Sequence, residues 1–110
     1  MRLEKESLNS LIKQMELIAK SFFASKQYAQ VCNRLGDKRT NDDKYRQTQL
    51  IKKVESTYER LNPIEQLFIN NDFFYEEYPM WWKDIYSKGH YLMIKKRAII
   101  HFLRIFYDEE

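Results

Sequence analysis

Residues 81–106 read WWKDIYSKGHYLMIKKRAIIHFLRIF, and this stretch decides the fold that we expect for the whole chain. Two tryptophans open a short amphipathic segment, and a Ser-Lys-Gly turn signal follows at residues 87–89. A long run of apolar and basic residues then continues almost to the C-terminus. This order predicts a first helix over roughly residues 80–86, a turn, and a second helix over roughly residues 89–107.

The apolar residues of this second helix fall on two adjacent stripes when they are placed at about 100° per residue. An apolar arc of this width indicates a helix that several neighbouring elements contact. Ser87 precedes the helix and is a natural N-cap, because its hydroxyl can accept a free backbone N–H. The stripes consist of Tyr91, Ile94, Ala98, Phe102 and Ile105, and of Leu92, Ile99, Leu103 and Phe106.

The opposite arc of the same helix is basic. It carries His90, Met93, Arg97, His101 and Arg104, flanked by Lys96. From residue 88 to residue 104 there are five Lys or Arg residues and no acidic residue. Such a face can lie against phosphates, and its first turn can reach base edges in a major groove. A solvated face without a ligand is the plain alternative and the more common one.

Length and composition limit the class of protein. A chain of 110 residues fits one domain with one core. Two glycines and two prolines are too few for an all-β chain with many turns. The single cysteine, Cys32, excludes an intramolecular disulfide and fits a reducing compartment. The N-terminus lacks a signal-peptide pattern, and no apolar run is long enough to span a membrane. We therefore expect a cytoplasmic protein with no membrane partner.

The N-terminal part of the chain has the spacing of a long helix. Apolar residues recur at i, i+3 and i+4 from Leu8 onwards, which predicts a helix over roughly residues 7–35, capped by Ser7 and ended by Gly36. A break near residues 21–25 is an alternative. The near-heptad stripe also fits an oligomer seam, so a homodimer is one alternative. An intramolecular core helix is the preferred interpretation, because the later helices need a partner.

The middle of the chain supplies two further helices. A polar loop over residues 36–43 leads into a helix over roughly residues 43–61. Asn62 and Pro63 then form a strong start signal for a third helix, with Glu65 in its first turn. The aromatic segment 70–79 is open to two alternatives, a short strand or an irregular link.

Together these segments predict an all-α protein with a single domain, residues 1–110, of four or five helices. A helical hairpin would form residues 1–62, and its long first helix would pack on a C-terminal helix-turn-helix unit, residues 63–110.

The sequence gives no sign of catalytic or metal chemistry. Cys32 lies on the predicted apolar face, so a buried inert thiol is favoured over a nucleophile paired with His90 or His101. The two histidines are roughly three helical turns apart, which is too far for one metal ion. No glycine-rich phosphate loop is present. We expect a protein that is not an enzyme and holds no cofactor and no metal.

The pattern from Leu61 onwards, LNPIEQLFI, a spacer and WWKDIYSKGHYLMIKKRAIIHFL, resembles sigma-factor region 4 and the late-gene transcriptional activators of Gram-positive phages. The resemblance covers the C-terminal half and implies a helix-turn-helix with a DNA-binding or transcription-associated role. The matching positions are Leu61, Glu65, Ile69, Trp82, Ile85, Ser87, Tyr91, Lys95, Arg97, Ala98 and Phe102.

Two functional hypotheses follow. In the first, the protein contacts double-stranded DNA through Lys88, His90, Lys96, Arg97 and Arg104, and RNA polymerase or another protein is a further partner. In the second, the chain is a helical protein-interaction module without DNA binding. That module would dock a partner through the aromatic residues Phe73, Phe74, Trp81 and Trp82. The first hypothesis requires the basic face of the last helix to be open to solvent.

Overall fold

The computed structural model describes residues 3–35 and 41–107, without the side chains of residues 32–35 and 41–43. Three sequence predictions therefore lie outside the described residues. They are the buried Cys32 thiol, the Gly36 helix end, and the course of the loop between residues 36 and 40.

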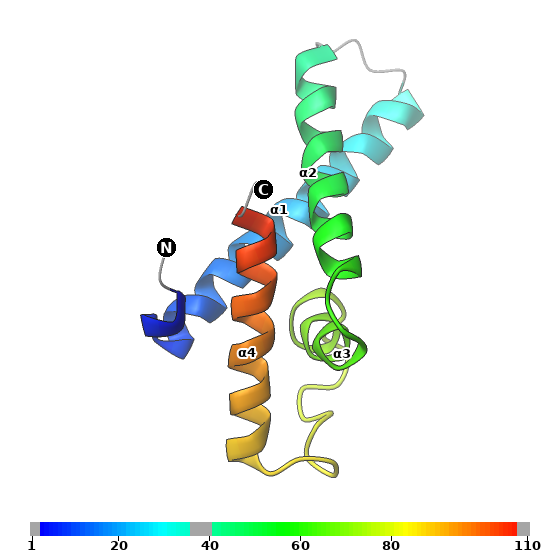
Figure 1. Cartoon of the computed structure of the whole chain (residues 1–110). Coiled ribbons are helices and arrows are strands. Elements are labelled where there is room, and N and C mark those ends of the chain that lie inside the picture. The colour runs from blue at the N-terminus through cyan, green and yellow to red at the C-terminus, as the bar shows by residue number, and fades with distance from the viewer. Residues whose placement is uncertain (1–2, 36–40, 108–110) are drawn as a thin grey trace.

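All the regular secondary structure in the described part of the chain is helical, with no strand, which confirms the all-α class. The described residues form four α-helices, and α1 is the long N-terminal helix that the sequence predicted (Figure 1). It is continuous through residues 21–25. The α-helices are α1 (Leu8–Leu35), α2 (Asn41–Glu59), α3 (Pro63–Ile69) and α4 (Lys88–Tyr107), with a short 3-10 helix η1 (Leu3–Lys5) and a π-helix η2 (Asn70–Phe74).

The helix α4 is the element around which the others pack. It contacts α1, α2, α3 and η1, while α1 and α2 pack on each other as a hairpin (Figure 1). This arrangement explains why α4 carries two adjacent apolar stripes, because several elements pack around it.

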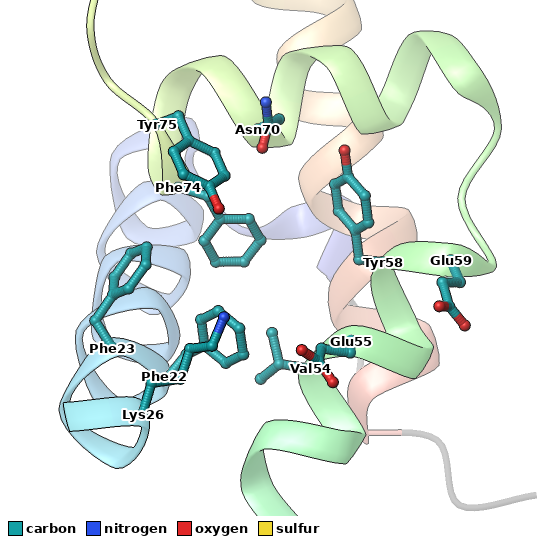
Figure 2. A pocket seen from close by; sticks show the side chains of 10 residues that line it. All are labelled: Phe22, Phe23, Lys26, Val54, Glu55, Tyr58, Glu59, Asn70, Phe74 and Tyr75. Carbon is teal, nitrogen blue, oxygen red and sulfur yellow. The ribbon is translucent and has the colours of Figure 1, made fainter. Parts of the chain in front are cut away.

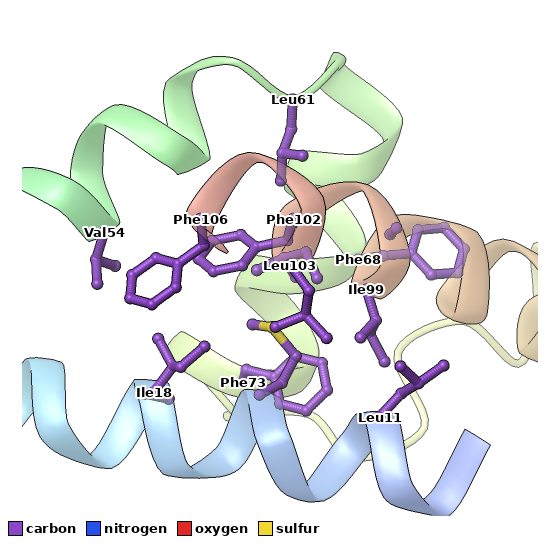
Figure 3. Close-up of a cluster of buried hydrophobic side chains, with 14 of the residues drawn as sticks. Leu11, Ile18, Val54, Leu61, Phe68, Phe73, Ile99, Phe102, Leu103 and Phe106 are labelled. Atoms are coloured by element: carbon purple, nitrogen blue, oxygen red, sulfur yellow. The ribbon is translucent and has the colours of Figure 1, made fainter. Parts of the chain in front are cut away.

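The core lies where α1, α3 and α4 meet, and Figure 3 shows its side chains interleaved between these helices. From α1, Leu11 and Met15 are fully buried, and from α4 so are Ile99, Phe102 and Leu103. Further apolar members are Leu3, Ile18, Ala19, Phe22, Val54, Leu61, Phe68, Ile69, Phe73, Tyr91, Ala98 and Phe106.

The three helix starts that the sequence predicted at Ser7, Asn62 and Ser87 are confirmed. Ser7 Oγ accepts the N–H of Ser10 at 3.1 Å, and Ser87 Oγ accepts the N–H of His90 at 3.2 Å. At the start of α3, Asn62 Oδ1 accepts the N–H of Glu65 at 2.8 Å, and Glu65 Oε1 accepts the N–H of Asn62 at 3.1 Å. This reciprocal capping box satisfies two backbone donors that a helix start would otherwise leave unpaired.

The prediction of a helix over residues 80–86 is wrong. Residues 79–85 form successive turns, in which the N–H of Trp81 donates to the carbonyl of Tyr78 and the N–H of Lys83 donates to that of Met80. Turns replace the helix because both tryptophans face inward. An α-helix would separate adjacent side chains by about 100°, whereas here Trp81 and Trp82 both contact Tyr91 of α4.

A pair of leucines on α1 tests whether this packing is the source of stability. Leu11 is 0% exposed and Leu17 is 66% exposed. We expect Leu11→Ala to lower the free energy of unfolding by about 2–5 kcal/mol, since it leaves a cavity. Leu17→Ala should change it by about 0.5 kcal/mol or less. Urea denaturation measures both, and equal losses would show that α1 does not pack in this way.

Candidate nucleic-acid interface

Three of the predicted DNA-contacting residues form one row along α4. His90, Arg97 and Arg104 are spaced seven residues apart, which places them on the same side of the helix at intervals of about 10.5 Å. All three side chains are exposed. The edge of the His90 ring lies against Tyr86, with 5.3 Å between the ring centroids. Below, we call these three residues the basic row.

The cationic side chains of α4 differ in their exposure and in whether they form an ion pair. Lys88 and Arg97 are exposed, Lys96 is half-buried, and within the described residues none of the three makes an ion pair. Arg104 pairs with Glu4 of η1, and both side chains are more than half exposed. Such exposed pairs contribute roughly 0–1 kcal/mol. A phosphate could therefore replace Glu4 at small cost.

Two other cationic groups of α4 are engaged inside the fold. The Nδ1 atom of His101 lies 2.7 Å from Glu65 Oε1, the same oxygen that caps α3. The Nζ atom of Lys95 lies 3.3 Å from Asp72 Oδ2 and 3.2 Å from the hydroxyl oxygen of Tyr91. These residues hold α4 to α3 and η2.

The Asp72 carboxylate is the centre of the most connected polar cluster in the described chain. Trp81 donates its Nε1–H to Oδ1 at 2.8 Å, and Tyr91 donates its hydroxyl to Oδ2 at 2.6 Å. With the ammonium of Lys95, the carboxylate therefore has three partners, although its side chain is only 7% exposed. We call these four residues the Asp72 cluster. The cluster joins η2 and α4 to the turns at residues 79–85, which we call the turn segment.

Aromatic rings surround the phenol of Tyr91. The rings of Trp82 and Tyr91 stack with centroids 4.2 Å apart, and those of Phe68 and Tyr91 stack at 5.7 Å. Burial raises the pKa of Tyr91 above its ordinary value, and the hydrogen bond to Asp72 and the charge of its carboxylate raise it further. The phenol therefore remains a hydrogen-bond donor to Asp72 in the folded state.

The Asp72 cluster sets the direction of the basic row. Tyr91 and Lys95 lie one turn apart on α4 and are drawn toward η2 and the turn segment. His90 and Arg97 therefore remain on the exposed side of the helix. Through these contacts, the irregular segment 75–87 packs against the first two turns of α4.

The four residues of the alternative docking patch are used inside the fold. Phe73 is buried, and Phe74 packs against Phe22, Phe23 and Tyr58. Trp81 and Trp82 are half-buried against Phe68 and Tyr91. These side chains therefore do not form the exposed aromatic patch that the sequence suggested, because the packing of η2 and the turn segment takes them up.

The role of Asp72 was not predicted from the sequence. It stands in Asn70-Asn71-Asp72, which reads as a helix-loosening polar run. Its position between the buried residues Ile69 and Phe73 is the signal that could have revealed the cluster. A carboxylate there requires partners, since an unpaired buried charge is costly.

Among the described residues, no group of His, Cys, Asp and Glu side chains is placed to hold a metal ion. The same residues include no helix with an apolar stretch long enough to cross a membrane. No protein-family model matches the chain, and no curated protein and no solved structure is significantly similar to it.

The raised pKa of Tyr91 predicts how stability depends on pH. The folded state keeps the phenol protonated where the unfolded chain ionises it, so this stabilisation is present below pH 10 and is lost as the pH rises further. Between pH 9 and pH 11, urea denaturation should show the free energy of unfolding falling more steeply for the wild type than for Tyr91→Phe. The difference approaches about 1.4 kcal/mol per pH unit.

Replacement of an exposed tyrosine, Tyr45→Phe, is the matched control and should leave the wild-type slope unchanged. Parallel profiles for the wild type and Tyr91→Phe would contradict the placement of the phenol against Asp72.

Proposed function

We propose that the protein is a non-enzymatic DNA-binding protein with a transcription-associated role, and that α4 contacts the phosphates of a duplex. The observation that carries the proposal is that α4 contains no acidic residue, while its Lys88, Lys96 and Arg97 side chains make no ion pair within the described residues. The resemblance of the C-terminal half to sigma-factor region 4 favours the same role for this helix.

The proposed affinity comes mainly from neutralised phosphates. Lys88, Lys96 and Arg97 can each meet a phosphate without breaking a contact within the fold, and Arg104 can exchange Glu4 for one. Each phosphate contact contributes about −0.9 to the slope of log K against log salt. Four contacts therefore give a slope of roughly −3.6. Binding should be moderate, largely independent of sequence and strongly sensitive to salt.

Readout of bases would fall on the first turn of α4. Lys88 and His90 are exposed there, whereas Gly89 offers no side chain and has open space around it. Fewer base-edge contacts mean less discrimination between sequences, since phosphate contacts carry no sequence information. Weak sequence preference is therefore part of the proposal.

A helical protein-interaction module is the second candidate function, and one observation favours it. Several large apolar side chains of α3 and the turn segment are exposed, between 43% and 65% of their surface. A protein partner, such as RNA polymerase, could cover them. These residues are Ile64, Leu67, Met80 and Ile85. The two functions differ in their dependence on salt and on the cations of α4.

Fluorescence anisotropy of a labelled random-sequence duplex tests the proposal. We expect micromolar binding at about 50 mM salt that falls steeply by about 200 mM. The double variant Lys96→Ala, Arg97→Ala should bind more weakly, and its salt slope should be shallower by about 1.8, because it loses two phosphate contacts.

The double variant Lys13→Ala, Lys20→Ala is the matched control, since it removes two exposed cations of α1 and leaves α4 intact. It should retain wild-type binding. Absence of binding at low salt, or an equal loss in both double variants, would exclude α4 as a DNA-contacting helix.

A further inference from the structure

A hollow lined by aromatic side chains lies away from the basic row, between α1, α2 and η2. Figure 2 shows the residues that line it, and its volume is about 400 Å³. This volume falls in the range of small-molecule sites. The lining consists of Phe22, Phe23, Lys26, Val54, Glu55, Tyr58, Glu59, Asn70, Phe74 and Tyr75.

Phe74 joins the aromatic walls of this pocket. Its ring centroid lies 5.5 Å from that of Phe22, 6.1 Å from that of Phe23 and 6.2 Å from that of Tyr58. The backbone N–H of Tyr75 donates to the carbonyl of Asn70 at 2.7 Å, the bond of a π-turn. The wider turn of a π-helix is frequent at functional sites.

The charges at the rim of the pocket are mostly negative. Glu55 and Glu59 lie one turn apart on α2 and are exposed, and within the described residues neither makes an ion pair. Lys26 of α1 is the one cationic residue of the lining. Its Nζ atom lies 4.8 Å from the centroid of the Phe22 ring.

The position of Lys26 indicates what the pocket can accept. The face of an aromatic ring carries partial negative charge and attracts a cation within about 6 Å of its centroid. The chain's own ammonium already occupies the face of Phe22 in this way. The carboxylates of Glu55 and Glu59, which make no ion pair within the described residues, add to the attraction for positive charge, and the apolar walls favour a carbon skeleton.

From this geometry we propose that the pocket binds a small organic cation, in which an ammonium group is carried on an aromatic or short alkyl skeleton. The skeleton packs among Phe23, Phe74 and Tyr58, and the ammonium faces Glu55, with Glu59 one turn further along α2. An anion would meet two carboxylates and the negative faces of the rings. A neutral molecule of the same shape would gain only the burial of its skeleton.

A titration with two matched probes tests the proposal. We would follow the backbone amides of the full chain by ¹H–¹⁵N NMR, first with 2-phenylethylammonium and then with its neutral analogue 2-phenylethanol. Both should shift the amides of the three segments that line the pocket. The ammonium should bind about five- to thirty-fold more tightly, since cation–π contacts and carboxylates act only on the cation.

Two variants should change the affinity for the cation in opposite directions. Glu55→Gln with Glu59→Gln should bring the affinity for the ammonium close to that for the alcohol. Lys26→Gln removes the competing internal ammonium, so it should raise the affinity for the cationic probe. The double variant Glu16→Gln, Glu77→Gln removes two exposed carboxylates outside this pocket and should behave as the wild type.

Three results would overturn the proposal. These are equal affinities for the two probes, shifts confined to amides outside the pocket, and weaker binding of the ammonium by Lys26→Gln. All substituted glutamates are exposed, so these variants should fold, and their NMR spectra show directly whether they do. The DNA titration does not involve these residues, so the two proposals can fail independently.

Discussion

The buried carboxylate of Asp72 is the constraint on which the C-terminal half depends. It accepts hydrogen bonds from Trp81 and Tyr91 and lies within ion-pair distance of Lys95, three residues that are 9, 19 and 23 positions further along the chain. Hydrogen bonds to a charged group contribute about 1.5–3 kcal/mol each. These contacts hold a segment that has no regular helix of its own, and they fix α4 against η2.

The basic row and the aromatic pocket, on which the two proposals rest, both depend on this arrangement. Because Lys95 and Tyr91 turn inward, His90 and Arg97 stay exposed on α4. The same π-helix that carries Asp72 places Phe74 in the aromatic pocket on the other side. The basic row and the pocket are therefore built on elements that meet at η2, although they share no residue. The structure places exposed cations on α4 and, around the pocket, carboxylates with aromatic rings.

Patterns among residues close in the sequence predicted most of the helices. Contacts between residues far apart in the sequence could not be predicted. Ser7, Asn62 and Ser87 mark helix starts because a cap acts within three residues of itself. The apolar stripes of α4 could be predicted for the same reason, because the helical repeat relates residues that are close in the sequence. The turns at residues 79–85 could not be predicted, because the contacts of both tryptophans with Tyr91 override the helical pattern. The pairing of Arg104 with Glu4, and that of His101 with Glu65, likewise required the fold.

The two adjacent tryptophans allow a direct test of the Asp72 cluster. Trp81 donates its indole N–H to Asp72, whereas within the described residues the indole N–H of Trp82 has no hydrogen-bond acceptor. Hydrogen exchange of the two indole protons, followed by NMR, should show the Trp81 proton exchanging only through substantial unfolding and the Trp82 proton exchanging much faster. Equal and rapid exchange of both protons would contradict the account, because the carboxylate would then not hold the turn segment.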